Sequence, residues 1–240
     1  MILRADTPEV GAVELRLREV LRQVRPDESK LFPELVDNYE EYHRHVETGQ
    51  LLRARLIAPW IDTGSTVLDA GCGDGLMAEF LTRERAARVR GFDLAAAAVE
   101  KTRSRGIPAE TRDLDAAPEM PDGFDYILFV EVLEHLRFPH RVLRSASQHA
   151  RKAVIVTIPN SAWFLYRLQL LLGHSPVQSF THLHFWGHRD FTAFCRRLGV
   201  RSPELRVATS SVGWRRAIIG RWPNLFAQQL AYRIPRDARI

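Results

Sequence analysis

Hydrophobic positions along the chain follow two spacings, one typical of strands and one typical of helices. Short, mostly apolar runs predict strands at 65–69, 88–93, 108–112, 124–130, 153–158, 204–209 and 228–234. Apolar residues at helical spacing predict helices at 39–60, 76–84, 95–105, 139–150 and 190–198. Strands that alternate with helices are joined by right-handed crossovers. The pattern therefore predicts an α/β, Rossmann-like doubly wound fold with a mostly parallel, seven-stranded sheet.

Two segments do not fit this alternation. Residues 1–30 carry one apolar stripe at helical spacing and end at Arg25-Pro26-Asp27, a helix-stop signal, so they predict an N-terminal helical extension. The remainder, 31–240, is expected to form one domain. Within it, 159–187 is longer than a routine connection and predicts a cap inserted after the fifth strand.

The amino-acid composition indicates how the chain is stabilised, which cellular compartment suits it and which ligands its charge favours. With 240 residues, 45% of them hydrophobic, it can bury a core without disulfides or metals. The two cysteines, Cys72 and Cys195, are too few for a disulfide framework, which favours a cytoplasmic location. No apolar run is long enough to span a membrane, and residues 1–11 lack the apolar segment of a signal peptide, so we expect neither a membrane span nor a signal peptide. The net charge is +5, and nearly all of the cationic residues are arginine. Arginine suits the recognition of phosphate or RNA, but a genome that favours arginine codons would give the same composition.

The segment Val67-Leu-Asp-Ala-Gly-Cys-Gly-Asp-Gly75 is the most informative motif. It lies at the first strand-to-helix turn, where open α/β sheets bind ligands, and Asp93 ends the next strand, at the place from which a carboxylate reaches ribose hydroxyls. The loop reads GxGxG, and its carboxylates Asp69 and Asp74 oppose a bound pyrophosphate. A ligand with an ammonium, a sulfonium and an adenosine suits it better than a dinucleotide, and S-adenosylmethionine (SAM) has all three.

VLDAGCGDG, GFDLA after the second strand, RDLD after the third and FDYILFVEVLEHL around the fourth resemble the class I SAM-dependent methyltransferases. The resemblance implies that the loop lines the methionine moiety of SAM, that Asp93 binds the ribose, and that Asp113 with Leu114 flanks the adenine. It implies that Val130 and Glu131 close the site beside the sulfonium. The complete set of expected cofactor residues is Asp69, Gly71, Cys72, Gly73, Gly75, Asp93, Leu94, Asp113, Leu114, Val130 and Glu131. Cys72 itself is expected to be a small packing residue rather than a nucleophile.

The later segments KAVIVTIPN (152–160), YRLQLLLG (166–173), Pro176-Val177 and His184 before Arg189-Asp-Phe191 resemble the MetW family, within the methyltransferase type 11/23 group. Members of that family are associated with methionine biosynthesis and with a homoserine O-acyltransferase partner. The resemblance therefore implies one alternative that is not an enzyme: a SAM-binding partner of such an acyltransferase.

Glu131, Glu134 and His135 follow the fourth strand at i, i+3 and i+4, a spacing that places side chains on one helical face. With His182 or His184 from the cap, they could bind Mg²⁺ or Mn²⁺, and a metal would lower the pKa of an acceptor hydroxyl. The EVLEH box and the later His-x-His resemble small-RNA 3′-terminal 2′-O-methyltransferases and quinone-pathway O-methyltransferases. Two other interpretations stay open: His135 acts as a general base without metal, or Glu134 simply caps a helix N-terminus.

The sequence thus predicts a SAM-dependent methyltransferase that O-methylates a small molecule or glycan, with Glu131, Glu134, His135 and His184 as catalytic and metal-ligand candidates. The enzymatic alternative is a metal-dependent methyltransferase for RNA 3′ ends. Weaker candidates are a lid (Tyr39, Tyr42, His43, Arg44, His45), an acceptor pocket (Phe180, Phe185, Trp186) and an aromatic-basic segment suited to nucleic acid or an anionic headgroup (Trp214, Arg215, Arg216, Arg221, Trp222). The oligomeric state is left open.

Overall fold

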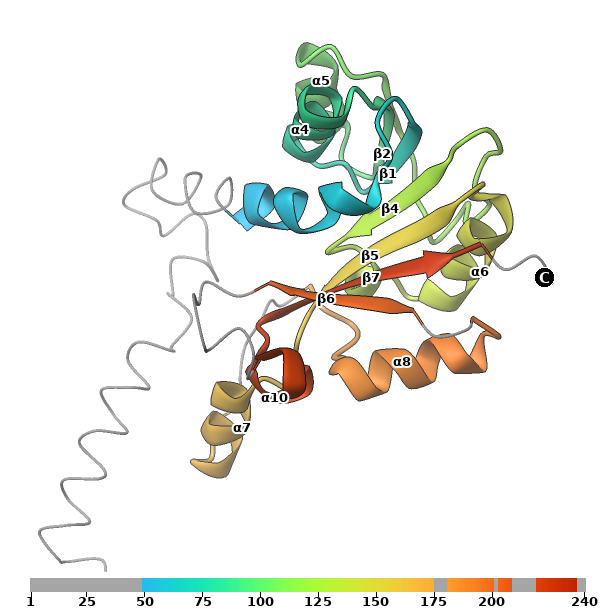
Figure 1. The fold of residues 1–240 in the computed structure, drawn as a ribbon. Helices are drawn as coiled ribbons and strands as arrows, with labels where there is room; N and C mark the ends of the chain where they lie inside the picture. The colour runs from blue at the N-terminus through green and yellow to red at the C-terminus, as the bar shows by residue number, and fades with distance from the viewer. Residues whose placement is uncertain (1–48, 175–180, 201–202, 209–218, 237–240) are drawn as a thin grey trace, which may run out of the picture.

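A computed structural model describes residues 49–174, 181–200, 203–208 and 219–236. Its seven strands form one sheet in the order β3-β2-β1-β4-β5-β7-β6 (Figure 1). The strands are β1 (Thr66–Ala70), β2 (Arg88–Asp93), β3 (Ala109–Thr111), β4 (Tyr126–Val130), β5 (Ala153–Pro159), β6 (Glu204–Ala208) and β7 (Gln229–Pro235). The first five run parallel, and β7 is antiparallel to both of its neighbours. The predicted doubly wound, mostly parallel sheet is confirmed.

Helices cover both faces of this sheet, as expected where right-handed crossovers connect parallel strands. They are α4 (Leu76–Arg85), α5 (Ala96–Ser104), α6 (Pro139–His149), α7 (Phe164–Leu171), α8 (His188–Arg197) and the short α10 (Pro223–Phe226), with 3-10 turns η2 (Ala58–Trp60) and η3 (Leu133–His135). Residues 49–57 are also helical and run into η2.

The central strands are apolar on both faces, so they support two hydrophobic layers. On one face Leu68 and Phe129 belong to a buried cluster with Val142 of α6 and Phe191 of α8. On the other face Val67 and Leu128 of the same strands belong to a cluster with η2 and α4. Alternate residues of one strand thus enter opposite layers, which fixes the strand register.

The carboxyl ends of β1, β2, β4 and β5 meet at one edge of the sheet. The register pairs Ala70 with Phe92, and Val130 with Thr157, so the loops that follow these strands start side by side. Parallel α/β sheets bind ligands at this edge. The glycine loop, Asp93 and the EVLEH box are therefore neighbours in the fold.

Some predicted boundaries are wrong by a few residues. The fourth strand begins at Tyr126 rather than 124, and the carboxylate of Asp125 takes the place of a strand partner by accepting the backbone N–H of Thr66 at 3.0 Å. The predicted extension at 1–30 and the lid residues Tyr39, Tyr42, His43, Arg44 and His45 lie outside the described residues. Among the described residues, none of the helices is both long and apolar enough to cross a membrane.

Candidate cofactor and acceptor site

The turn at 71–75 brings bare backbone to the carboxyl edge of the sheet. Gly71 has φ 99°, and a Cβ there would lie 2.3 Å from Cγ2 of Val132, so a side chain would collide with the segment after β4. Gly73 has φ 55°, and a Cβ there would meet no described atom within 4 Å. Glycine tolerates both backbone conformations. The turn is thus closely packed at Gly71 and open at Gly73, where a ligand can approach the backbone. Gly75 ends the turn as the N-cap of α4.

Asp93 ties this turn to the end of β2. Its Oδ2 accepts the backbone N–H of Gly73 at 2.8 Å, and its Oδ1 accepts that of Ala95 at 2.9 Å. The next residue, Leu94, is 69% exposed, although large apolar side chains normally avoid water. A carboxylate and an exposed apolar surface therefore stand side by side at the edge of the glycine turn.

Asp69, at the end of β1, is a buried and unpaired acid. Its side chain is 1% exposed, and neither carboxylate oxygen has a hydrogen-bond partner among the described residues. Burial, and secondarily the charge of Asp93, raises its pKa from 3.8 to about 7. A buried carboxylate without partners is costly. This position favours a cationic or hydrogen-bond-donating group beside the turn.

Cys72 is a packing residue, as predicted. It is 5% exposed, and its Sγ lies 2.6 Å from where a Cβ on Gly91 would stand. Burial raises the pKa of the thiol to about 12, so it is protonated at neutral pH and a poor nucleophile. Only its backbone can face a ligand bound at the turn.

The segment after β3 borders the same edge. Asp113 is exposed, and its Oδ1 accepts the backbone N–H groups of Asp115 and Ala116 at 2.8 and 3.2 Å. Leu114 is 7% exposed and packs in the core, so its side chain offers little surface to a ligand. Val130 ends β4 half-buried.

The expectation that Glu131, Glu134 and His135 share a helical face is wrong. Glu131 has φ 56°, a left-handed conformation, and only 133–135 form a 3-10 turn. The hydroxyl of Thr157 donates to Oε1 of Glu131 at 3.0 Å, which holds that carboxylate toward β5. The pKa of Glu131 is raised by burial, although the nearby Arg53 guanidinium opposes the shift. Glu131 is therefore not in the close group that Glu134 and His135 form, although its charge still acts on Glu134.

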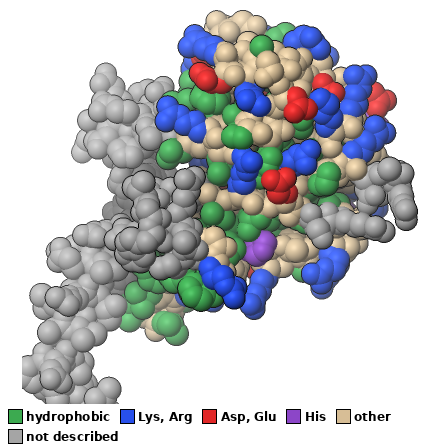
Figure 2. All heavy atoms as spheres, in the orientation of Figure 1, with side chains coloured by type: hydrophobic (Ala, Val, Ile, Leu, Met, Phe, Trp, Pro, Cys, Tyr) green, Lys and Arg blue, Asp and Glu red, His purple; other side chains and the backbone are tan. Residues whose placement is uncertain are grey.

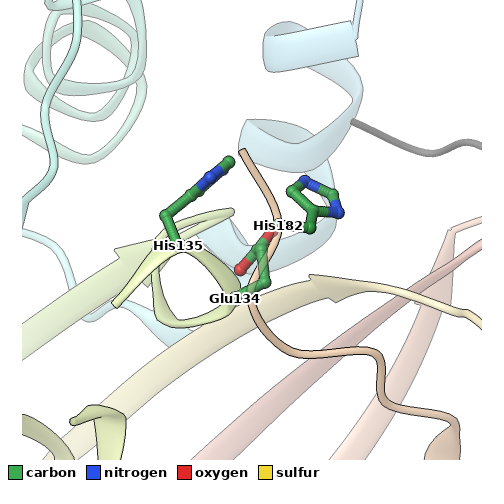
Figure 3. A group of neighbouring side chains, drawn as sticks. All are labelled: Glu134, His135 and His182. Atoms are coloured by element: carbon green, nitrogen blue, oxygen red, sulfur yellow. The ribbon is translucent and has the colours of Figure 1, made fainter. Parts of the chain in front are cut away.

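The structure groups Glu134 and His135 with His182 of the cap (Figure 3). One potential ligand atom from each residue lies within 4.8 Å of the others. Glu134 is 1% exposed and both of its carboxylate oxygens lack a hydrogen-bond partner among the described residues. Burial, then the charge of Glu131, raises its pKa well above 4.5. This group is called the Glu-His-His cluster below.

The two histidines of the cluster differ in environment. Their ring centroids are 4.7 Å apart, and Nδ1 of the exposed His135 lies 3.2 Å from the carbonyl of Thr181. Burial, with His135 nearby, lowers the pKa of His182 to about 4, so its ring is neutral at physiological pH. A neutral imidazole is the form that binds metals.

His184 does not join the cluster, contrary to expectation. Its Nε2 is 2.9 Å from the carbonyl of Leu136, and its ring stacks on Trp186 with centroids 4.9 Å apart. Trp186 in turn packs against the core on the α8 side, which draws His184 away. Of the predicted acceptor-pocket residues, Phe185 is 57% exposed, and Phe180 lies outside the described residues.

Arg53, on the helical segment 49–57, is a site residue that sequence reasoning missed. Its charge acts on Glu131 and Glu134 in the direction that lowers both pKa values, and its Nε is buried without a partner among the described residues. One arginine among thirty-one gives no signal in the sequence. Only the packing of this helix against the sheet brings it to the carboxylates.

Comparison with known proteins places this architecture in a family. The family model described as methionine biosynthesis protein MetW matches residues 53–234. The chain belongs to the MetW family. The match contains the glycine turn, Asp93 and the Glu-His-His cluster, so the site described above lies inside the matched region.

Other relatives of this MetW-family chain are methyltransferases by name. A ubiquinone biosynthesis O-methyltransferase of Chromobacterium violaceum is 38% identical over 91 residues, 35% of this chain and 39% of the relative, so the match spans about two fifths of that protein. A SAM-dependent methyltransferase of Thermotoga maritima matches with TM-score 0.60 and 18% identity over 82% of this chain and 95% of that one. Magnesium protoporphyrin IX methyltransferase of Synechocystis matches with TM-score 0.58 and 17% identity over 92% and 94%. The fold is therefore that of SAM-dependent methyltransferases.

The unpaired carboxylate of Asp69 generates a prediction about stability. Because the folded pKa of about 7 exceeds the ordinary 3.8, the folded protein loses stability as the pH rises from about 4 to 7. Asp69→Asn removes this penalty and should raise the free energy of unfolding at pH 8 by up to about 4 kcal/mol, with a gain that shrinks toward zero near pH 4.

Urea unfolding of the ligand-free protein at pH 8, 6 and 4.5 measures this effect. Asp122→Asn, which removes an exposed carboxylate, is the matched control and should change stability little at any of these pH values. Equal effects of Asp69→Asn at all three pH values would contradict the prediction.

Proposed function

We propose that this MetW-family protein is a SAM-dependent methyltransferase. The observation that carries the proposal is the buried, unpaired carboxylate of Asp69 beside an open glycine turn. A carboxylate in that position stabilises a positively charged ligand, and SAM carries an ammonium and a sulfonium. A pyrophosphate would instead bring more negative charge next to Asp69, which disfavours a dinucleotide.

The remaining residues of the turn fit the other parts of SAM. Asp93 has carboxylate oxygens with acceptor capacity beyond the two backbone N–H groups they bind, enough for ribose hydroxyls. Leu94 offers exposed apolar surface for the adenine, and Asp113 lies exposed at the same edge. The bare backbone at Gly73 allows the methionine moiety to come close.

The acceptor that we favour is a hydroxyl of a small molecule or glycan. Methyl transfer is an in-line displacement at the sulfonium, so the protein's main contribution is to orient the two reactants. An oxygen nucleophile must also lose its proton, and the exposed ring of His135 is placed to accept it. The names of the curated relatives, which are O-methyltransferases, support oxygen as the methylated atom.

The Glu-His-His cluster also fits a divalent cation. One carboxylate and two imidazoles suit Mn²⁺ better than Mg²⁺, which prefers oxygen ligands. Glu134 has both oxygens free to bind, and His182 is neutral. A cation bound there would lower the pKa of an acceptor hydroxyl. In its absence His135 remains the base.

The family match favours a second candidate: a SAM-binding partner of a homoserine O-acyltransferase that transfers no methyl group. A stable complex with that enzyme and no methylation of any acceptor would identify it. The RNA alternative stays a prediction, and it requires RNA affinity that falls steeply with salt. Screening methylation of hydroxylated acceptors, with co-purification of the acyltransferase and RNA binding at low salt, separates the three.

Asp93→Ala tests the cofactor site. The change removes a charged hydrogen-bond acceptor for the ribose, so SAM binding should weaken by about 1.5–3 kcal/mol, roughly 10- to 150-fold. Isothermal calorimetry with SAM and with S-adenosylhomocysteine measures this loss. Because Asp93 also holds Gly73, thermal melting is needed to show that the variant folds, and Asp122→Asn should bind normally. Unchanged affinity in folded Asp93→Ala would refute the assignment.

Paired histidine variants test the metal site. Because His182 lies in the cluster and His184 does not, His182→Asn should lower Mn²⁺ affinity by at least about tenfold and His184→Asn should change it little. Electron paramagnetic resonance of free Mn²⁺ during titration measures both affinities. Failure of the wild-type chain to bind Mn²⁺, or equal losses in the two variants, would exclude this site and leave His135 as a metal-free base.

A further inference from the structure

The cap carries an apolar surface that the proposed reaction does not use. Helix α7 stands away from the sheet next to α10 (Figure 1), and the rings of Phe164 and Phe226 join the two helices at 5.9 Å. Large apolar side chains on these helices point into solvent, with Leu170 58%, Leu171 83% and Trp222 53% exposed. Phe164, Leu170, Leu171, Leu172 and Trp222 are called the α7–α10 patch here.

Arginines border this patch. Arg167 lies on α7 and Arg221 precedes α10, where its Cζ is 5.9 Å from the ring centroid of Trp222. Helix α8, whose N-terminal end lies against α10, adds the exposed Arg189 beside the patch, whereas its Arg196 and Arg197 lie at the opposite end of the helix. Because Phe191 and Cys195 of α8 face the core, Arg189 and Arg196 lie on its outward side. Figure 2 shows apolar side chains at the lower left of the molecule and cationic ones along its lower edge.

The charge of this region does not follow from an arginine-rich composition alone. On α4, α5 and the neighbouring strands, arginines are paired with carboxylates: Arg83 with Glu79, Arg90 with Glu110 and Arg103 with Glu100. None of the three arginines that border the α7–α10 patch, Arg167, Arg189 and Arg221, forms an ion pair with a described carboxylate. The one acid of α8, Asp190, accepts the backbone N–H of Gly187 at 3.0 Å. Among the described residues, this region therefore carries more positive than negative charge.

We propose that the α7–α10 patch docks this protein on an anionic lipid bilayer surface. Exposed leucines and a tryptophan can enter the boundary between headgroups and acyl chains, while arginines contact the anionic headgroups. Trp222 with Arg221 combines both chemistries in adjacent residues. A nucleic acid would use the arginines but leave Leu170 and Leu171 in water, and a second copy of the chain would have to bring like charges together. Neither accounts for the apolar and the cationic halves of the region at once.

Vesicle flotation of the full chain tests this docking. Vesicles of phosphatidylcholine alone are compared with vesicles in which about a third of the lipid is phosphatidylglycerol. The wild-type chain should float with the anionic vesicles, less so at high salt, and stay behind with the neutral ones. Leu171→Asp should reduce partitioning at least about tenfold, because it removes an apolar anchor and adds a negative charge. Arg167→Glu with Arg221→Glu should reduce it at least about 25-fold, since each cation near the surface contributes about fivefold.

Two matched controls separate the patch from general effects. Leu52→Asp introduces the same charge at an exposed leucine on another helix, and Arg88→Glu reverses an exposed arginine at the start of β2. Both should float like the wild-type chain, and all variants should keep their affinity for SAM, so that failure of docking is distinguishable from failure of the cofactor site.

Three results would overturn the proposal: no flotation of the wild-type chain, equal flotation with neutral vesicles, or equal losses in the control variants. Light scattering on a sizing column and binding to a poly-uridine oligonucleotide identify the other occupants. A dimer that Leu171→Asp converts to a monomer would assign the patch to a second copy. Oligonucleotide binding lost in the arginine variants but kept in Leu171→Asp would assign the region to nucleic acid.

Discussion

The cofactor side of the candidate site depends on one unfavourable feature, the buried carboxylate of Asp69 near the end of a central strand, which has no hydrogen-bond partner among the described residues. Asp69 continues an apolar strand, and its neighbours in the sheet are backbone and hydrophobic side chains, so its charge is neither solvated nor bonded. The fold tolerates this cost because the carboxyl edge of the sheet lies beside the glycine turn. A cationic ligand bound there can replace the solvation that the Asp69 carboxylate loses on folding. We therefore expect Asp69 to weaken the ligand-free protein and to strengthen a complex with a cationic ligand, a trade of stability for binding.

Most of the fold could be predicted from the sequence because the strands are buried on both faces. Near-continuous apolar runs such as 126–130 and 153–158 fit few structures other than a buried strand. The glycine, proline and charged residues that separate these runs mark the loops from local sequence alone. The loop 71–75 could be predicted equally well, because its glycine spacing and the acid that ends the next strand can both be read from short segments of sequence. The predicted strand boundaries were wrong where a polar side chain takes the place of a strand partner, as the carboxylate of Asp125 does for Thr66.

The acceptor side was harder to predict because it depends on contacts between distant segments. The choice between His182 and His184 rests on Trp186, which packs on the α8 side of the core and stacks with His184. The separation of Glu131 from Glu134 rests on Thr157, a residue of the next strand, and on a left-handed backbone that sequence spacing does not reveal at a glutamate. Arg53 comes from yet another segment. Each of these is a tertiary contact with no signature in the spacing of its own motif.

The way the cap is attached links the two sides of the site. The backbone carbonyl of Glu134 accepts the N–H groups of Leu183 and His184 at 2.7 and 3.1 Å, so the segment that carries His182 is fixed to the very turn that carries Glu134 and His135. The place of His182 in the cluster therefore depends on these two backbone hydrogen bonds, and their loss would separate His182 from Glu134 and His135. Under the proposed function, SAM binding depends on the carboxyl edge of the sheet, and the acceptor chemistry depends on the attachment of the segment that carries His182.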